Sequence, residues 1–571
     1  MGATWSVGDR LTIPSVLDEQ AQKRHDQPFL YILDEPVTYG AMRARAVSSA
    51  NALAASGIEP GDRVAIYMGT SAEWIDTWFG AAYLGAVAVP VNAAYRGEFL
   101  ANQLRDSNTK AIAVDASLAD RLLAVVGDAP SLRTVFVRPD GDGEGGDGES
   151  GLPVAPDGVT VHPIERLREG DPGEVAGGAA PAWNQPGAIF YTSGTTGRSK
   201  GALVTQHYLL SAARTMVDCW RLQPGETVYG PLPLFHLSAV GTVLGPMLAG
   251  GTGVLEKVFS VNNTWDQVRR YDAAGIALAG ALVVMLWNLP PDERDKDLPI
   301  RFLSAAPVPK EIYHDIEERY GCRIVTVYGT TEAFPLSYAG VDVDNPPGAS
   351  GRANPGFEVK IFDDEDNEVP AGTVGEIVCR PRRPHTMFEG YDGRPEATLE
   401  QMRNLWFHTG DLGRFDEDGN FTYVDRKKDA MRRRGENISS FEVEQALLRH
   451  PAVAEVAAIG VPSELGEDDV MVCVVAKPGE TVDVVPFMDF CRERLPYFAV
   501  PRYVEVCAEL PKNAVGRVLK HELRARGVTD ATWDREQAGY SVRVDSAGGP
   551  AGHTARRPGA DDPRNRPSLR P

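Results

Sequence analysis

The chain has 571 residues, of which 43% are hydrophobic, so it is long enough to form more than one domain with a sizeable core. Its formal net charge of −21 argues against binding to nucleic acid or to an anionic membrane surface, because both require a basic face. The six cysteines are scattered without Cys-x-x-Cys spacing, which indicates neither a zinc site nor a disulfide framework and favours a reducing cytoplasm. We expect no secretory signal, because the N-terminus has no basic segment followed by an apolar core of about 7–15 residues. We also expect no stable membrane anchor, because the longest apolar run is shorter than the roughly 20 residues that a membrane helix needs.

Short runs of small and β-branched residues alternate with longer amphipathic stretches through the first four hundred residues. The clearest strand candidates are residues 63–67, 86–89, 111–114 and 134–137. This alternation predicts parallel sheets with helical crossovers, and therefore a large α/β domain. The longest apolar run, residues 275–289, predicts a buried strand followed by a helix.

The segment 191–201, with the sequence YTSGTTGRSKG, combines hydroxyl side chains, glycines and two cations in one short loop. Glycines permit close backbone approach, and consecutive N–H groups can then surround an anion. The spacing is not that of the Walker A loop, Gly-x-x-x-x-Gly-Lys-Ser/Thr, and a solvated turn of the same composition is the alternative. The candidate phosphate ligands are Thr192, Ser193, Gly194, Thr195, Thr196, Gly197 and Lys200.

The character of the sequence changes near residue 428. Beyond it, strand-like runs at 453–461 and 470–476 precede a helix-like run at 484–495. From residue 533 the chain is rich in Gly, Pro, Arg and Asp without hydrophobic periodicity, which predicts a disordered tail. We therefore expect a large N-terminal domain of packed β-sheets with flanking helices at 1–427, a small α+β domain at 428–532 and a tail at 533–571.

Four further motifs follow the glycine-rich loop in a fixed order: Ser304-Ala-Ala-Pro307, Tyr328-Gly-Thr-Thr-Glu332, His408-Thr-Gly-Asp411 with Val424-Asp-Arg-Lys-Lys-Asp429, and Arg434-Gly-Glu-Asn-Ile438. Together with YTSGTTGRSKG they resemble the acyl-adenylate-forming superfamily, which includes acyl-CoA synthetases, peptide-synthetase adenylation domains and beetle luciferases. The resemblance extends from about residue 30 to residue 526. It implies an AMP-forming ligase that uses ATP and Mg²⁺ to convert a carboxylic acid into an acyl-AMP and then transfers the acyl group to CoA.

The resemblance also implies how the motifs bind the nucleotide. The loop would hold the β- and γ-phosphates, with Lys200 as a catalytic cation, and Glu332 would hold Mg²⁺, which prefers carboxylate and phosphate oxygens. Asp411 and Arg426 would bind the ribose hydroxyls. The residues implied to surround the adenine and the neighbouring phosphates are Ser304, Ala305, Ala306, Tyr328, Gly329, Thr330 and Thr331.

In the same way, the small domain would be a mobile lid that rotates about a hinge at Lys428. Rotation would bring the following loop to the adenylate, where the thiol of CoA attacks. The loop residues so implied are Arg434, Gly435 and Glu436. Together with Arg432 and Arg433, Arg434 also suits the phosphates of CoA, because guanidinium groups bind phosphate through paired hydrogen bonds.

His236 lies at the family position that borders the acyl pocket. Apolar candidates for lining this pocket are residues 237–240, residues 281–286 and Phe334, which suit an alkyl, alkenyl or aryl acid. Amino-acid activation is disfavoured, because peptide-synthetase domains carry an Asp directly after the Phe that here precedes His236.

The sequence departs from the family near its C-terminal end. Most members have a lysine that bridges the substrate carboxylate and the α-phosphate, and this chain has Arg517 in its place. A guanidinium keeps the charge but is wider and planar. Lys520 lies three residues further on, one helical turn away, so Arg517 and Lys520 are both candidates for the bridging cation.

Two other functions remain open at this point. One is a diazotase of natural-product biosynthesis, which resembles acyl-CoA ligases but adenylates nitrite for attack by an arylamine. The other is a nucleotide-binding protein that has lost turnover through Arg517. For the ligase we expect small-molecule partners, no nucleic acid, and a monomer or homodimer.

Overall fold

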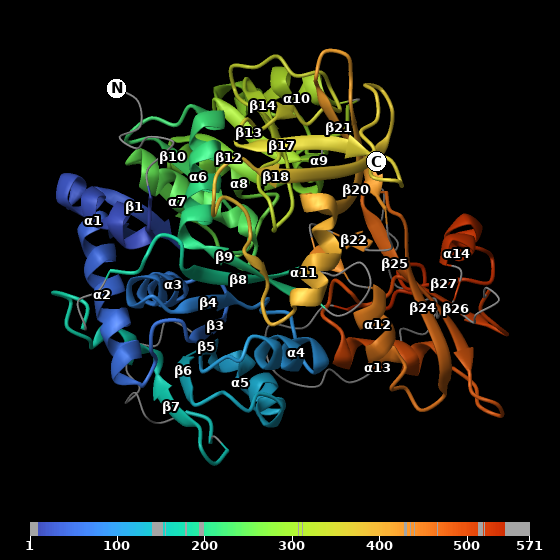
Figure 1. The fold of residues 1–571 in the computed structure, drawn as a ribbon. Helices are drawn as coiled ribbons and strands as arrows, with labels where there is room; N and C mark the ends of the chain where they lie inside the picture. The colour runs from blue at the N-terminus through green and yellow to red at the C-terminus, as the bar shows by residue number, and fades with distance from the viewer. Residues whose placement is uncertain are drawn as a thin grey trace, which may run out of the picture.

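Two large β-sheets and the helices packed around them form the N-terminal domain, and a smaller domain lies beside it (Figure 1). The computed structural model describes residues 10–139, 152–154, 156–176, 180–192, 199–306, 308–310, 312–427, 431–433, 436–438, 440–464, 466–511, 518 and 520–542. Every structural statement below concerns these residues. The predicted fold class, a large sheet-rich α/β domain followed by a small α+β domain, is confirmed.

The first sheet has eight strands within the described residues, in the order β19-β9-β8-β4-β3-β5-β6-β7. The strands β3 to β6 run parallel to their neighbours, as the four predicted strand segments require. The bounds are β3 (Arg63–Tyr67), β4 (Val87–Pro90), β5 (Ala111–Asp115), β6 (Thr134–Arg138), β7 (Thr160–Pro163), β8 (Pro186–Thr192), β9 (Lys200–Thr205) and β19 (Gly390–Tyr391). The connecting helices are α3 (Ala72–Leu84), α4 (Glu98–Asp106) and α5 (Ala116–Leu123).

The second sheet has nine strands in the part of the chain that the structure describes, in the order β16-β15-β14-β13-β12-β10-β11-β1-β2. Its bounds are β1 (Pro28–Ile32), β2 (Glu35–Thr38), β10 (Thr227–Gly230), β11 (Thr252–Leu255), β12 (Ala273–Ala279), β13 (Phe302–Ala306), β14 (Arg323–Tyr328), β15 (Ser337–Ala339) and β16 (Arg352–Ala353). The run at 275–289 forms β12 and α9, as predicted. The helices of this region are α1 (Ile13–Arg24), α2 (Tyr39–Ala55), α6 (Gln206–Trp220), α7 (Val240–Ala249), α8 (Thr264–Arg270), α9 (Gly280–Trp287) and α10 (Tyr313–Tyr320).

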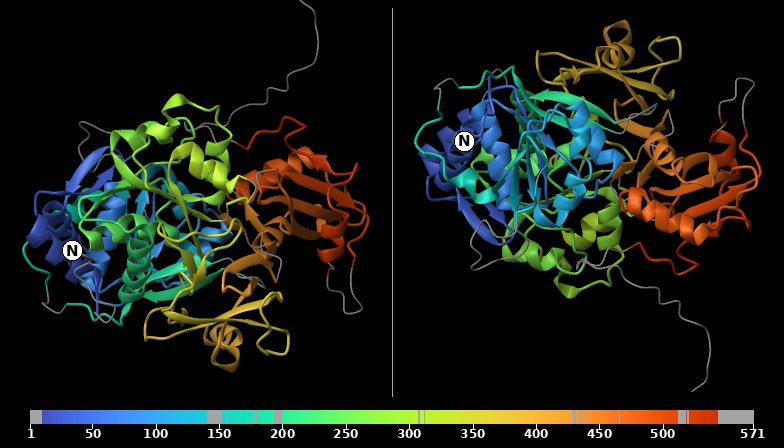
Figure 2. Two further views of the ribbon diagram at one scale, coloured as in Figure 1. Left: turned by 90° about the horizontal axis from the view of Figure 1, so that it is seen from above. Right: turned by 90° about the horizontal axis from the view of Figure 1, so that it is seen from below.

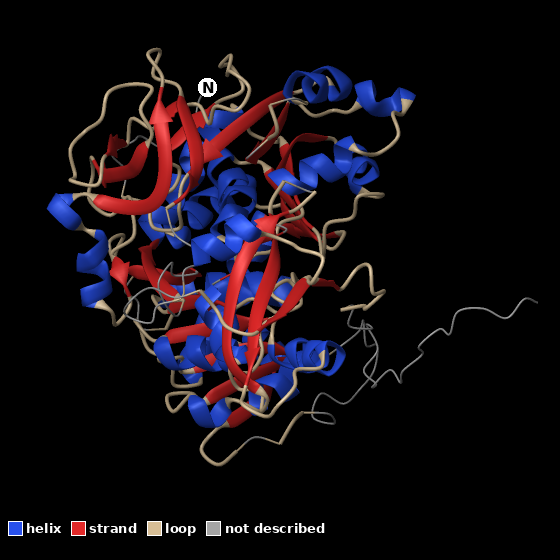
Figure 3. Cartoon of the chain, turned by 90° about the vertical axis from the view of Figure 1, so that its right-hand side faces the viewer, coloured by secondary structure: helices blue, strands red, loops and turns tan. Residues whose placement is uncertain are grey.

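One continuous hydrophobic core joins the two sheets. It contains buried residues of α1, α2, α3, α6 and α7 together with strands of both sheets, and Figure 3 shows helices lying between strands in the interior of the large domain. A smaller antiparallel sheet, in the order β17-β18-β20-β21, completes the domain. Its elements are β17 (Phe357–Phe362), β18 (Gly375–Pro381), β20 (Phe407–Phe415), β21 (Phe421–Arg426) and the adjacent helix α11 (Pro395–Gln401).

The small C-terminal domain has its own core around Val443, Val472 and Phe487. The predicted strands and helix of this region are present as β24, β25 and α13. The bounds are β22 (Met431–Arg433), β23 (Glu436–Ile438), α12 (Ser440–Leu447), β24 (Val453–Pro462), β25 (Asp468–Ala476), α13 (Val484–Arg494), β26 (Tyr503–Cys507), α14 (Lys520–Arg526) and β27 (Trp533–Asp534). Seen from above and below, this domain contacts the large domain along one side (Figure 2).

The predicted boundary of the C-terminal tail, residue 533, lies too early in the chain. Residues 533–534 form β27, which pairs with β26, and buried Arg535 donates to the carbonyl oxygens of Val500 and Pro501 at 3.2 Å. Tyr540 then donates its hydroxyl to Asp489 Oδ1 at 2.6 Å. Polar and aromatic anchors therefore hold this segment without the apolar periodicity on which the prediction relied. Within the described residues, no helix is both long and apolar enough to cross a membrane.

Candidate active site

The predicted phosphate-binding loop connects β8 to β9, two antiparallel strands that end and begin with Thr192 and Lys200 facing each other. Thr192 Oγ1 donates to the Lys200 carbonyl oxygen at 3.4 Å. Lys200 is 8% exposed, so its cation is held inside the domain at the base of the loop. Ser193, Gly194, Thr195, Thr196 and Gly197 fall in the segment 193–198, which the structure does not describe, and their phosphate contacts stay a prediction.

Glu332 lies beside these two strand ends and is 6% exposed. Its Oε1 accepts a hydrogen bond from the Tyr391 hydroxyl at 2.7 Å and a longer one from Thr192 Oγ1 at 3.4 Å. Lys200 Nζ lies 5.0 Å from the centroid of the same Tyr391 ring, within cation–π range. Tyr391 therefore connects the Lys200 side chain to the buried carboxylate.

A tight turn after β14 positions Glu332. A Cβ at Gly329 would lie 2.9 Å from the Ala333 carbonyl oxygen, so the turn needs a residue without a side chain there. Thr330 and Ala333 exchange backbone hydrogen bonds at 3.0 and 3.1 Å, and the Tyr208 hydroxyl donates to the Thr331 carbonyl oxygen at 3.0 Å. Burial raises the pKa of Tyr208 well above its usual value, so this donor keeps its proton.

The carboxylate of Glu332 fits the predicted Mg²⁺ site. Both hydrogen bonds that it receives from described residues fall on Oε1, which leaves Oε2 to bind a cation. No group of three or more His, Cys, Asp or Glu side chains among the described residues could hold a metal ion alone. A single carboxylate is nevertheless the usual protein contribution where phosphate oxygens complete the Mg²⁺ shell.

The predicted ribose and adenine residues meet at a different point of the same region. The Tyr328 hydroxyl donates to Asp411 Oδ2 at 2.9 Å, with both side chains buried, and burial raises the pKa of Tyr328 well above its usual value. Asp411 pairs in register with Arg426 across β20 and β21, which puts both backbone positions side by side, although the structure does not describe the Arg426 side chain. Ribose binding by Asp411 and Arg426 therefore stays a prediction with a supporting backbone geometry.

Residues 304–306 end β13, which runs parallel to β14. The carboxyl ends of parallel neighbours share one sheet edge, where open α/β sheets usually bind ligands. Ser304 and Ala305 are buried and Ala306 is half-buried, so Ala306 is the member of this motif nearest to solvent. Tyr328 and Gly329 follow at the same edge, as the predicted adenine site requires.

An ionic cluster around Glu376 of β18 holds His408, the first residue of the HTGD motif, in place. His408 Nδ1 lies 3.2 Å from Glu376 Oε2, and Lys427 Nζ lies 3.1 Å from the same oxygen. Burial alone would raise the pKa of Glu376, but the hydrogen bonds from His408 and Lys427 overcome this effect and lower that pKa to about 2. Lys427 is the last described residue before the predicted hinge at Lys428, which lies outside the described ranges.

The C-terminal domain contacts the predicted acyl site through Glu436. Its Oε2 accepts from His236 Nε2 at 3.1 Å and from Asn92 Nδ2 at 3.3 Å. Glu436 is 9% exposed, so the contact is enclosed. Sequence reasoning assigned His236 and Glu436 to two separate elements, and the structure brings them together; the neighbours Arg434 and Gly435 fall among the residues left undescribed.

Of the two candidates for the bridging cation, Lys520 lies within the described residues, and its contacts with Ser440 and Glu444 are not at this interface. Lys520 Nζ contacts Ser440 Oγ at 2.7 Å and Glu444 Oε1 at 2.6 Å, all within the small domain, and Arg517 is not among the described residues. Which of them bridges the substrates stays open.

Arg433, one of the three arginines expected to suit the phosphates of CoA, is buried inside the small domain. Its side chain is 4% exposed, donates to the carbonyl oxygens of Phe498 and Val500, and lies 3.0 Å from Asp469 Oδ1. Along β22 the buried side chain of Arg433 and the exposed side chain of Arg432 point to opposite faces. A run of adjacent arginines in the sequence does not indicate which of them is buried.

The apolar pocket candidates divide into two groups. Leu237 and Val240 belong to the core of the large domain near His236, with Phe334 packed against that core. Val283 and Leu286 have no exposed surface and belong to a separate cluster with residues of β12 and β13. Helical periodicity turns these two side chains into that core, and a pocket role for the other residues of 281–286 stays a prediction.

Sequence reasoning missed Tyr391, Asn92 and Glu442. Tyr391 stands beside Gly390 at the edge strand β19, and neither its spacing nor its neighbours indicate a role. Glu442 lies in the first turn of α12 and accepts hydrogen bonds from the Ser199 backbone N–H and Oγ at 2.7 and 2.6 Å. An acidic residue in the first turn of a helix is common, since it complements the helix dipole, so the sequence does not single it out.

The site therefore combines a buried cation and a buried carboxylate suited to Mg²⁺ at the two strand ends that flank the glycine-rich loop, as an adenylate-forming enzyme requires. The family model for AMP-binding enzymes matches residues 17–392, and the model for the AMP-binding enzyme C-terminal domain matches residues 442–517. The chain belongs to the family of AMP-binding enzymes.

Known proteins agree with this assignment. A crotonobetaine/carnitine–CoA ligase from Salmonella agona (strain SL483) is 30% identical over 502 residues, which cover 85% of this chain and 93% of the relative. The fold matches a double mutant of o-succinylbenzoate CoA synthetase from Bacillus subtilis, bound with its product analogue OSB-NCoA, with a TM-score of 0.76 at 24% identity, covering 90% of this chain and 99% of that one.

The same synthetase in complex with AMP gives a lower TM-score, 0.63, at 24% identity, covering 90% of this chain and 98% of that one. Both comparisons show that this chain has the fold of that synthetase.

Proposed function

We propose that this AMP-forming acid–thiol ligase carries out two half-reactions at the face between its two domains. In the first, a carboxylate oxygen attacks the α-phosphorus of ATP, forming acyl-AMP and releasing pyrophosphate. In the second, the thiol of CoA attacks the acyl carbon and AMP leaves. The observation that carries this proposal is the convergence of Lys200, Tyr391 and Glu332 directly beside the glycine-rich loop.

In the first half-reaction, negative charge grows on the departing pyrophosphate. Lys200 is buried at the base of the loop, where a cation stabilises such charge more strongly than it would in water. Glu332 would hold Mg²⁺, which when bound offsets charge on the triphosphate. Tyr391 keeps both side chains in place, because its hydroxyl binds Glu332 and its ring lies near Lys200.

For the second half-reaction we propose that Glu436 and His236 border the acyl adenylate. The enclosed contact among Glu436, His236 and Asn92 fixes the small domain against the predicted acyl site. This contact brings the chain segment that follows Arg434 and Gly435 to the place where a thiol would have to approach. It supports a role for this loop in thioester formation.

We further propose that the acid has an apolar body. Leu237 and Val240 are buried next to His236, and half-buried Phe334 packs against the same core, so this side of the site offers hydrocarbon contacts. The curated relatives are named for crotonobetaine and carnitine, which makes short zwitterionic acids worth including in a substrate screen.

The comparisons do not favour the nitrite-activating alternative, since the relatives matched along most of the chain are CoA ligases. A pyrophosphate-release screen over short and long fatty acids, crotonobetaine-like acids, aryl acids and nitrite, each with and without CoA, tests the proposal. We expect release with one class of carboxylic acid, and acyl-CoA only when CoA is present. Release with nitrite alone would establish the alternative, and ATP binding without turnover of any acid would indicate a degenerate binder.

A further inference from the structure

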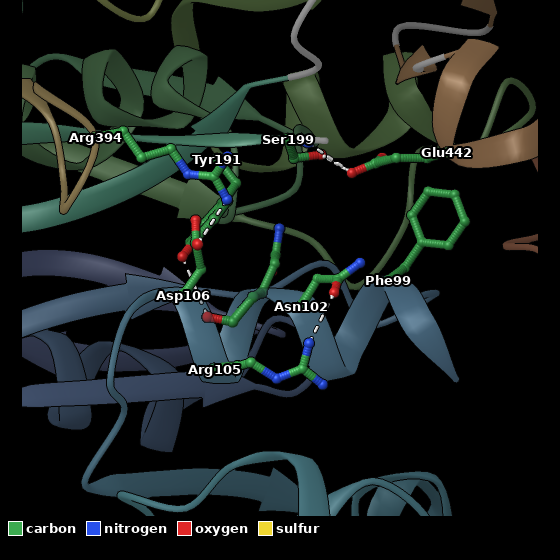
Figure 4. A pocket seen from close by; sticks show the side chains of 9 residues that line it. Phe99, Asn102, Arg105, Asp106, Tyr191, Ser199, Arg394 and Glu442 are labelled. Atoms are coloured by element: carbon green, nitrogen blue, oxygen red, sulfur yellow. Dashed lines mark hydrogen bonds and ion pairs between the residues drawn. The ribbon is translucent and has the colours of Figure 1, made fainter. Parts of the chain in front are cut away.

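The residue that precedes Lys200 is bound by the C-terminal domain. Ser199 donates both its backbone N–H and its hydroxyl to one oxygen of Glu442, Oε1, at 2.7 and 2.6 Å. Glu442 is 8% exposed, so two domains enclose this contact. Figure 4 shows it at one end of a pocket that is also lined by Asp106 and Arg394, which form an ion pair at 2.6 Å.

These two donors are of the kind that bind phosphate. A backbone N–H and a hydroxyl beside a buried lysine complement any anionic oxygen, and here the anion is a carboxylate of the same chain. If a β- or γ-phosphate used the donors of Ser199, Glu442 could not, because one oxygen occupies both and two anions at this distance repel each other. Ser199 can therefore bind phosphate or the small domain, but not both.

The contact belongs to the arrangement in which the small domain reaches the predicted acyl site. Glu436 contacts His236 and Asn92 in the same structure, and the Arg449 guanidinium of the small domain lies 2.9 Å from Glu98 Oε1 on α4. Phe99, on the same helix, is buried in the core of the small domain. Glu442 is thus one part of an extensive docked interface, and it is the part that lies next to the phosphate-binding loop.

We propose that Glu442 is a positioning residue for thioester formation, which docks the small domain by taking over the donors of Ser199 once pyrophosphate has left. This inference rests on the proposed two half-reactions. In it, the carboxylate of Glu442 and the leaving pyrophosphate compete for the hydrogen-bond donors of Ser199. Docking of the small domain therefore depends on departure of pyrophosphate. Glu442 does not touch the reacting atoms and acts through Ser199.

A binding measurement tests the competition without an acid substrate. Methylenediphosphonate, a pyrophosphate analogue, is titrated with Mg²⁺ into the parent enzyme and into Glu442→Ala, Glu442→Gln and Glu493→Ala. We expect Glu442→Ala to bind the analogue at least fivefold more tightly, because docking no longer competes for Ser199. Glu442→Gln retains an acceptor oxygen and should lie between Glu442→Ala and the parent. Glu493 is an exposed carboxylate of the same domain, so its alanine variant should match the parent.

Kinetics then separate a positioning role from general stabilisation. With the acid that releases most pyrophosphate from the parent, we expect Glu442→Ala to slow single-turnover thioester formation from the preformed acyl-AMP and CoA by at least tenfold. Pyrophosphate release from ATP should change by less than twofold. The double variant Ser199→Ala/Glu442→Ala should be little slower than Glu442→Ala alone, since the two residues act through one contact.

Three outcomes would overturn the proposal. Glu442→Ala could leave binding of the analogue unchanged, it could slow both half-reactions equally, or it could leave the thioester step at the parental rate. If Glu442→Ala does not fold, Glu442→Gln must still show tighter binding of the analogue than the parent. Failure of the proposed function is distinguishable, because the parent enzyme itself would then release no pyrophosphate with any acid.

Discussion

The hydroxyl of Tyr391 offers a direct test of how the buried carboxylate of Glu332 is supported. Tyr391→Phe removes the 2.7 Å hydrogen bond to Glu332 Oε1 and keeps the ring that lies 5.0 Å from Lys200 Nζ. A hydrogen bond to a charged group contributes about 1.5–3 kcal/mol, and among the described residues only the longer contact from Thr192 would remain on that oxygen. We therefore expect adenylate formation to slow by roughly 10- to 150-fold, with a higher Mg²⁺ requirement.

The assay is single-turnover pyrophosphate release at several Mg²⁺ concentrations. Tyr271→Phe is a matched control, because the Tyr271 hydroxyl also donates to a carboxylate, that of exposed Asp34, away from the site. Tyr391→Leu should be slower again by about twofold or more, since it also removes the aromatic face near Lys200. Lys200→Ala and Glu332→Ala should each lower the rate by at least tenfold. Release from Tyr391→Phe within twofold of the parent, with unchanged Mg²⁺ dependence, would refute the assigned contact.

Three further predictions follow from other parts of the structure. Comparing Arg517→Ala with Lys520→Ala identifies the bridging cation, because the variant that slows pyrophosphate release more has lost that cation. Equal small effects would exclude both residues. Lys520→Ala should also lower the thermal midpoint, because Glu444 loses its ion pair with Lys520. Deleting residues 543–571 should leave the thermal midpoint unchanged, whereas deleting 536–571 should lower it by about 2 °C or more, because the Tyr540 anchor on Asp489 is lost. Equal midpoints for both truncations would contradict this. The pKa of Glu376 is lowered to about 2, so its contribution to stability is present above the ordinary value near 4.5 and is lost as pH falls from there toward 2. Glu376→Gln should therefore weaken the pH dependence of the free energy of unfolding between these two values. An unchanged pH dependence would argue against the cluster.

The sequence predicted the framework well because the framework depends on periodicity. Parallel strands buried on both faces appear as short apolar runs, and each of the four predicted runs is a strand of the eight-stranded sheet within a residue of its expected bounds. The same reasoning failed at residues 533–542, where the anchors are Arg535 and Tyr540 and not an apolar stripe. Helical periodicity also placed Val283 and Leu286 in the core, away from the pocket.

Motif residues were easier to find than the residues that support them. Glycine-rich spacing and the order of motifs identify Lys200 and Glu332, but nothing in the sequence indicates that Tyr391 joins them. Its edge strand β19 pairs with β9, and the preceding Phe388 donates its backbone N–H to the Glu332 carbonyl oxygen. Contacts of this kind depend on tertiary packing between segments that are distant in the sequence, which no local pattern records.

The charged residues of the small domain divide between contacts to the large domain and contacts within the small domain itself. Glu436 and Glu442 both contact the large domain here, while Lys520 is held by Glu444 and Ser440 within its own domain. A lysine so engaged cannot at the same time reach a carboxylate and an α-phosphate at the other domain. If Lys520 is the bridging cation, it must therefore exchange Glu444 for the substrate when the small domain turns, and the first half-reaction must use a face of that domain other than the one docked here.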